Sequence, residues 1–306
     1  MPIVLLMNMS KTNKSYLETI KLVRKLTIIS LFADDLLMNT FVIKGGNLMD
    51  IGFGISDRAS IDIDVSMSDD FPPDKLEDIR LRLEKALIKT FDDHDLLVFD
   101  VTLVAKPKEA YVAVKDFWGG YLLLFKAIDK AKAASLSLEA MRKQALLLGP
   151  DNSAKFKVDI SKFEYCDNKE AITIDDYTIY VYSSVMFVYE KLRAICQQIP
   201  SYTAIIHQQP RQRARDFYDI YTIVNKLELE SSLFSAENLQ ILQEIFAAKK
   251  VPIDLLLEIK NHSDFHADSF ASVVDTVTDK SNLQDFDFYR DYVSNLAARL
   301  KPSGEK

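Results

Sequence analysis

The feature that most constrains the fold is a short segment in which apolar and acidic residues alternate, Ile61-Asp62-Ile63-Asp64-Val65. Alternation with a period of two predicts a β-strand, because successive side chains on a strand point to opposite faces. The apolar residues then face a core, and Asp62 and Asp64 lie side by side on the other face. Two adjacent carboxylates repel each other unless a cation lies between them. The segment therefore predicts a sheet strand that carries a cation-binding pair.

A glycine pair upstream points to the same chemistry. The apolar run 41–44 ends at Gly45-Gly46, and residues 47–51 predict a short helix. Glycine backbone can approach a phosphate closely, and the N–H groups at a helix start bind anions. Carboxylate oxygens suit Mg²⁺, which combines a few protein ligands with substrate phosphates. Either feature alone is common in ordinary sheets, but their succession favours phosphate chemistry.

The remaining periodicity divides the chain into two parts. Apolar spacings of three and four predict helices, and alternation predicts strands. Before residue 183 the predicted helices are 15–38 with one break, 72–93 and 129–148, and the predicted strands are 96–105, 120–127, 156–160 and 178–182. After it, only helices are predicted, over 184–198, 211–227, 236–248, 253–260 and 283–300. The fold class predicted is α+β: a mixed sheet with flanking helices over 1–182, then a helical domain over 183–306.

Composition limits where such a protein acts. The 306 residues carry a formal net charge of -7, so a surface that coats nucleic acid broadly is excluded and any such contact must be local. Two cysteines, Cys166 and Cys196, form no disulfide framework, which fits a reducing compartment. The apolar run 2–7 is shorter than a signal-peptide core, and no segment is apolar enough to span a membrane. We expect a cytoplasmic protein.

Two separated motifs resemble the nucleotidyltransferases of the AbiEii/AbiGii toxin type, within the DNA polymerase β-like superfamily. The first motif comprises Lys44, Gly45, Gly46, Arg58, Ser60, Asp62 and Asp64. The second comprises Glu190-Lys191-Leu192 followed by Arg215-Asp216-Phe217-Tyr218-Asp219. They occur in the family's order, about 130 residues apart, and the resemblance covers roughly 41–226.

The resemblance implies Mg²⁺-dependent transfer of a nucleoside monophosphate from an NTP. It places the protein as the toxin of a toxin–antitoxin or abortive-infection system, with a cognate antitoxin as a partner and, as in related toxins, a tRNA 3′ end or another RNA as acceptor. It implies metal binding by Asp62 and Asp64, and nucleotide binding by the first-motif residues Lys44, Gly45, Gly46, Arg58 and Ser60. It also implies four catalytic residues: Asp62, Asp64, Lys191, which would contact the triphosphate, and Asp216, which would orient the triphosphate or complete the active site. A third metal carboxylate is usual in the superfamily; Asp159 is preferred and Asp100 is the alternative.

Departures from the pattern keep other functions open. The superfamily has Gly-Ser where this chain has Gly45-Gly46, and Asn47 stands where a threonine is expected. Neither change removes the backbone N–H groups. One alternative is a non-catalytic nucleotide-binding or interaction protein of the same fold. Another is a nucleotidyltransferase that modifies protein side chains, including its own Ser60.

Several further residues have a functional and a structural interpretation. The arginines Arg211, Arg213 and Arg215 are the candidate RNA contact, although an ion pair between Arg215 and Asp219 on one helix is the default. Alternating tyrosines could stack a base, but more often pack in a core: Tyr177, Tyr180 and Tyr182. His262 and His266 lack a third metal ligand nearby, and we expect both at the surface.

Overall fold

The computed structural model describes residues 3–55, 62–108, 113–148 and 153–301, with side chains described from Tyr16 onward. Its centre is a seven-stranded mixed sheet in the order β3-β4-β5-β2-β1-β7-β6. The strands are β1 (Val42–Lys44), β2 (Ile63–Ser66), β3 (Leu96–Lys106), β4 (Gly120–Asp129), β5 (Phe156–Ser161), β6 (Lys169–Ile174) and β7 (Tyr177–Tyr182). β2 runs parallel to β5, and β1 runs parallel to β7. The other pairs are antiparallel.

The register of the central strands places charged residues next to each other. In β2 the apolar Ile63 and Val65 are buried, as the alternation predicts, and Asp64 lies on the opposite face. Asp64 pairs with Asp159 across the parallel β2–β5 ladder and with Lys44 across the antiparallel β1–β2 ladder. Three neighbouring strands therefore bring these side chains to one level of the sheet.

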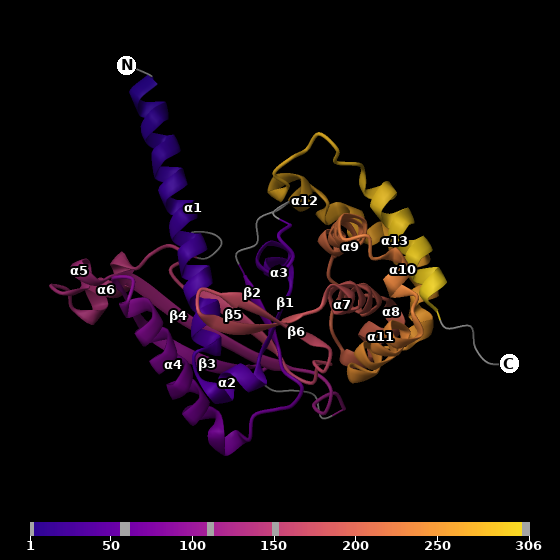
Figure 1. Cartoon of the computed structure of the whole chain (residues 1–306), viewed down its shortest axis with the longest axis horizontal. Helices are drawn as coiled ribbons and strands as arrows, with labels where there is room; N and C mark the ends of the chain where they lie inside the picture. The colour runs from indigo at the N-terminus through magenta and orange to yellow at the C-terminus, as the bar shows by residue number, and fades with distance from the viewer. Residues whose placement is uncertain (1–2, 56–61, 109–112, 149–152, 302–306) are drawn as a thin grey trace.

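Helices on the N-terminal side cover the sheet. α1 (Ile3–Phe32) packs on α4 (Leu76–Asp92) and on β7, and α4 packs on β3. The break predicted within 15–38 lies between α1 and α2 (Asp35–Thr40). Asp34 caps α2, since its carboxylate accepts the N–H groups of Leu36 and Leu37. The 3₁₀ turn η1 (Pro73–Lys75) leads into α4, and α3 (Gly46–Ile51) follows β1. Figure 1 shows α1 extending away from the body of the molecule.

The regular elements described after β7 are all helices, and they lie on the opposite side of the molecule from α5 and α6 (Figure 1). Their centre is α7 (Ser184–Cys196), which is buried on almost every side and contacts α9, α11 and β7. The other α-helices there are α8 (Pro200–Ile206), α9 (Ala214–Lys226), α10 (Glu230–Leu233), α11 (Ala236–Ala248), α12 (Ala271–Thr276) and α13 (Phe286–Leu300). The 3₁₀ helices are η3 (Ile253–Glu258), η4 (Lys260–His262) and η5 (Asp264–Ser269).

Three sequence expectations were wrong in detail. The helix expected over 129–148 is two short ones, α5 (Lys130–Ala133) and α6 (Leu138–Gln144), because Ser137 caps a new start by accepting the N–H of Ala140. β6 was not predicted, since it is an edge strand with charged and exposed positions. The segment 253–260 forms 3₁₀ turns rather than an α-helix. The expected helix end at Gly149-Pro150 lies outside the described residues.

The predicted α+β class is confirmed. The sheet ends at Tyr182 and α7 begins at Ser184, with the side chain of Ser183 accepting the N–H of Met186. The division into domains 1–182 and 183–306 stays a prediction. Among the described residues, no helix combines the length and apolarity required to cross a lipid bilayer.

Candidate active site

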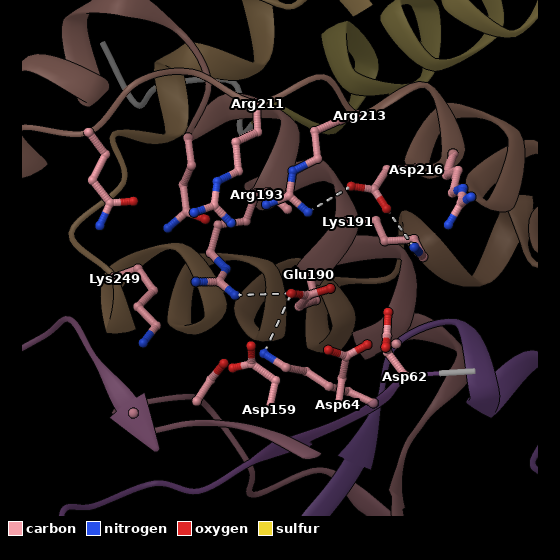
Figure 2. Close-up of a pocket in the computed structure, with 18 of the residues that line it drawn as sticks. Asp62, Asp64, Asp159, Glu190, Lys191, Arg193, Arg211, Arg213, Asp216 and Lys249 are labelled. Atoms are coloured by element: carbon pink, nitrogen blue, oxygen red, sulfur yellow. Dashed lines mark hydrogen bonds and ion pairs between the residues drawn. The ribbon is translucent and has the colours of Figure 1, made fainter. Parts of the chain in front are cut away.

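A large cleft lies between the strand ends of the sheet and the helical part. Its volume is about 890 Å³, and residues from both parts line it. Figure 2 shows Asp62, Asp64 and Asp159 along the sheet side, and Arg193, Arg211 and Arg213 on the helical side facing them. The cleft therefore has an acidic wall opposite a basic one.

Asp64 lies among other carboxylates in the acidic wall. Burial raises the pKa of Asp64 to about 7; Lys44 acts against this, while Asp159, Glu190 and Asp62 add to it. Burial and neighbouring carboxylates both disfavour the charged form of a carboxyl group. Asp62 is exposed and begins the wall just before β2. The predicted pair thus lies together in the cleft, with Asp159 beside it.

Gly45 brings the backbone against this acidic group. Its φ of 75° lies in the left-handed region, and a Cβ added there would fall 2.2 Å from Oδ2 of Asp64. Only glycine fits both constraints. α3 begins at the next residue, and Asn47 is buried, with its Nδ2 donating to the backbone oxygen of Asp62. The asparagine that departs from the family pattern therefore holds the glycine turn to the acidic strand.

The two candidates for a third carboxylate lie in different places. Asp159 lines the cleft next to Asp64, where it forms an ion pair with Lys106. Asp100 sits at a bulge in β3 with a φ of 54° and is held by Arg142 and Lys126. Hydrogen bonds from these two cations lower the pKa of Asp100 to about 2, against the effect of burial. Geometry thus favours Asp159, and its role as a metal ligand stays a prediction.

The carboxylates of the cleft fit a Mg²⁺ ion that is bound by protein and substrate oxygens together. In the parts of the chain that the structure describes, no three His, Cys, Asp or Glu side chains are grouped as a ready-made metal site. Two adjacent carboxylates, Asp64 and Asp159, with the exposed Asp62 nearby, supply few ligands and need substrate oxygens to complete the shell. This matches the preference of Mg²⁺ for one or two carboxylates plus phosphates.

A buried ionic cluster also lines the cleft, and sequence reasoning found only part of it. Glu164, in the turn after β5, contacts Lys44 at 3.1 Å, Arg193 at 3.0 Å and Lys249 at 3.5 Å. Glu190 contacts Lys44 at 3.7 Å and Arg193 at 3.4 Å. The surrounding cations hold the pKa of Glu164 well below its usual range despite complete burial. Glu164, Arg193 and Lys249 belong to no motif, and no local pattern identifies them.

Lys191 and Asp216, from the second motif, also meet, but in a closed arrangement. Nζ of Lys191 contacts Asp216 at 2.6 Å and Asp219 at 2.8 Å, and all three are buried. Asp219, which sequence reasoning paired with Arg215, thus joins α9 to α7. Oδ2 of Asp216 is buried without a hydrogen bond and lies 3.6 Å from Nη1 of Arg213. Contact of Lys191 with a triphosphate stays a prediction.

The segment before α9 forms the basic wall. Arg211 and Arg215 are exposed and Arg213 is half-buried, and all three line the cleft. His266 fixes this segment, since its Nδ1 accepts the backbone N–H of Arg213 at 3.0 Å. The expectation that His266 lies at the surface was therefore wrong: it is buried, and burial lowers its pKa to about 4.

Other candidates lie elsewhere. Arg58 and Ser60 are outside the described residues. Tyr182 is in the core, where its hydroxyl and that of Ser66 are 2.8 Å apart. Tyr177 is exposed at the start of β7, at the end of this strand away from Tyr182. Gly46, Lys44, Lys191 and Asp216 all line the cleft, so the structure gathers every described residue of the predicted site around one cavity.

Most of the chain matches the model of a known protein family. The model of the family described as nucleotidyl transferase AbiEii toxin, type IV toxin–antitoxin system, matches residues 29–292. No curated protein matches the chain. Among solved structures, a candidate nucleotidyltransferase from H. pylori is 16% identical, with 92% of this chain and 95% of that chain covered and a TM-score of 0.45.

Two more solved structures match at similar identity. JHP933 from Helicobacter pylori is 15% identical, with 92% of each chain covered and a TM-score of 0.44. An antigenic nucleotidyltransferase-like protein from Paracoccidioides brasiliensis is 16% identical, with 74% of this chain and 93% of that chain covered and a TM-score of 0.33. The family assignment rests on the family model.

The chain belongs to the AbiEii nucleotidyl transferase toxin family of type IV toxin–antitoxin systems. The family resemblance and the enzyme class predicted from the two motifs are thereby confirmed.

Proposed function

We propose that this protein transfers a nucleoside monophosphate from an NTP to an RNA 3′ end in a Mg²⁺-dependent reaction, as the toxin of a toxin–antitoxin pair in the cytoplasm. The observation that carries the proposal is the register of Asp64 beside Asp159, one strand away from the glycine turn. Carboxylates that share a cation and backbone N–H groups that donate to phosphate oxygens are then neighbours, as nucleotidyl transfer requires.

The residues of the cleft divide the reaction between them. The acceptor hydroxyl oxygen attacks the α-phosphorus and forms a new P–O bond. The bond to the β-phosphate breaks, its electron pair leaves with pyrophosphate, and the hydroxyl proton passes to Asp159 or to water. Mg²⁺, held by Asp62, Asp64 and Asp159 when bound, would neutralise charge on the reacting oxygens. Gly45 and Gly46 bind the leaving phosphates through their backbone.

An RNA acceptor is supported by the basic wall. Arg211 and Arg213 face the carboxylates across the cleft in Figure 2, and Arg215 also lines it, so a polyanion that enters is neutralised locally even though the chain as a whole is acidic. The charge balance thus favours a short RNA end over a long duplex. The family supports an antitoxin as a partner.

Incubation with each labelled NTP, Mg²⁺ and total RNA tests the proposal. We expect label in RNA, its removal by EDTA, and its loss in Asp64→Asn. Asp100→Asn is a matched control, because it makes the same change on the same sheet outside the cleft. Label in protein alone would replace the RNA acceptor with a side-chain acceptor. Nucleotide binding that is identical in wild type and Asp64→Asn, with no transfer, would overturn the enzymatic proposal.

A further inference from the structure

The cleft extends beyond the residues that the two motifs account for. The strand order places the glycine turn after β1, Asp64 on β2, Asp159 on β5 and Trp118 just before β4, in that order across the sheet. All four contribute to the lining of the same cleft. Trp118 therefore lies on the far side of the carboxylates from the glycine turn.

In-line transfer gives this far side a role. The attacking and leaving oxygens lie on opposite sides of the α-phosphorus. If Gly45 and Gly46 bind the leaving pyrophosphate, as the proposed function holds, the attacking hydroxyl approaches from the side of Asp159. The nucleotide that carries this hydroxyl then lies against the residues next along the cleft, which are Trp118 and Lys249.

Lys249 is a buried cation at the cleft surface, where it could bind an anionic group of a substrate. It is buried, lines the cleft and is drawn among its walls in Figure 2. Among the described residues, its ionic cluster holds three cations, Lys44, Arg193 and Lys249, against two carboxylates, Glu164 and Glu190. Burial lowers the pKa of Lys249 to about 8, helped by Arg193 and Lys44 and opposed by Glu164. Glu164 is shared by all three cations and Asp64 also lies beside Lys44, so a phosphate in the cleft would add a further anion beside Lys249.

Trp118 supplies a flat aromatic group beside that cation. Nζ of Lys249 lies 5.8 Å from the centre of the Trp118 ring, and it donates to the backbone oxygen of Lys162 at 2.5 Å. Trp118 is half-buried and packs on the core, so its position is fixed while part of the ring reaches the cleft. An aromatic ring beside a cation is the combination that binds single-stranded nucleic acid, by base stacking and phosphate contact.

We propose that Trp118 and Lys249 form the subsite for the terminal nucleotide of the RNA acceptor, with its base stacked on Trp118 and its phosphate held by Lys249. The proposal rests on the proposed function for the direction of approach. It does not depend on the identity of the NTP, which binds on the other side of the carboxylates.

Kinetics of labelled transfer to total RNA test the subsite. We expect Trp118→Leu and Lys249→Met to raise the KM for RNA roughly tenfold, as expected for one lost stacking or phosphate contact, and to leave the KM for NTP within twofold. Trp118→Phe keeps an aromatic face and should retain most of the affinity for RNA. Tyr177→Leu is the matched control, since it removes an exposed aromatic side chain from the opposite end of the sheet.

Thermal unfolding separates binding from a structural role. Lys249→Met leaves Glu164 paired with Lys44 and Arg193, so the variant should keep a Tm close to that of wild type while it loses affinity for RNA. If Lys249 instead has a structural role, the Tm of this variant falls and the affinity of its folded fraction for RNA is unchanged, which would overturn the assignment. The pair Trp118→Leu and Trp118→Phe, both apolar, still compares stacking with packing if Lys249→Met fails to fold.

Intrinsic fluorescence gives a readout that needs no catalysis. Trp118 is the one tryptophan in the 306-residue sequence, so all tryptophan emission reports on this position. A single-stranded oligoribonucleotide with a free 3′ hydroxyl should quench it, and ATP, GTP, CTP or UTP with Mg²⁺ should quench it much less. Equal quenching by an NTP would assign Trp118 to the NTP base and overturn the subsite. If wild type transfers no label while the oligoribonucleotide still quenches, the proposed reaction fails and the subsite stands.

Discussion

Gly45 packs directly on the carboxylate of Asp64: a Cβ added at Gly45 would lie 2.2 Å from Oδ2. We expect Gly45→Ala to lose nucleotide transfer, because the added methyl group displaces the carboxylate of Asp64. The alanine would also have to adopt the φ of 75° that Gly45 has. Gly54→Ala is the control, since Gly54 has a similar φ of 67° with nothing within 4 Å of the added Cβ.

The ψ of Gly45 is -168°, and with its positive φ this conformation is almost confined to glycine and costs other residues about 1 to 3 kcal/mol. Gly54→Ala carries the backbone cost of a positive φ, about 1 to 2 kcal/mol. Urea unfolding measures this cost, and transfer assays measure activity. Gly54→Ala should therefore lose stability but keep its transfer rate. Equal transfer rates in the two variants would show that the close approach of Gly45 to Asp64 has no part in the reaction.

The carboxylates of the cleft should differ sharply from Asp100. In the proposed reaction Asp64 and Asp159 would hold Mg²⁺, whose stabilisation of the transition state is worth several kcal/mol, so we expect Asp64→Asn and Asp159→Asn each to lower transfer roughly a hundredfold or more. Asp100→Asn should keep its transfer rate, because its partners Arg142 and Lys126 lie outside the cleft lining. Initial rates over a Mg²⁺ titration provide the measurement, and a raised Mg²⁺ requirement in Asp100→Asn would contradict the assignment.

Lys191 joins α7 to α9 through two carboxylates, and its removal should destabilise the helical part. Lys191→Met takes the Lys191 ammonium away from two buried carboxylates, Asp216 and Asp219, and loss of one partner of a buried pair costs about 3 to 5 kcal/mol. Adding Asp219→Asn should recover part of this loss, because it removes one of the two buried negative charges that Lys191 contacts. Urea unfolding of the single and double variants measures the coupling. Additive losses would show that the two residues act independently.

Sequence patterns predicted the elements whose hydrophobic periodicity or turn residues lie within the element itself. The alternation of 61–65 gave β2, and the glycine pair after an apolar run gave the turn before α3. The two motifs also identified Asp62, Asp64, Lys191 and Asp216, because their order along the chain matches a known family. These features depend on residues close in sequence, which is why sequence reasoning could find them.

Residues that act across long separations were missed. Glu164 contacts Lys44 and Lys249, which lie far from it in the chain and on other elements, so no periodicity relates them. His266 was placed at the surface because its partner, the backbone N–H of Arg213, is 53 positions away. β6 was not predicted because the exposed side chains of this edge strand give a pattern typical of a loop. Tertiary packing decides all three.

The buried imidazole of His266 makes stability depend on pH. Its pKa falls to about 4 in the folded chain, chiefly through burial, with Arg213 lowering it and Asp216 opposing. The unfolded chain, with an ordinary value near 6.5, binds the proton more readily. Stability from this group is therefore complete above about pH 6.5 and is lost as the pH falls toward 4. At pH 5 the loss should be about 2 kcal/mol.

His266→Asn isolates this effect. The Oδ1 of asparagine can still accept the N–H of Arg213, but the side chain no longer titrates in this range. Urea unfolding at pH 7 and pH 5 gives the free energy of unfolding of both proteins. Wild type should lose about 2 kcal/mol more than the variant between the two values, since other titrating groups affect both proteins alike. If both proteins lose the same free energy of unfolding between pH 7 and pH 5, the imidazole of His266 is protonated in the folded chain at pH 5. Its Nδ1 could then not accept the backbone N–H of Arg213.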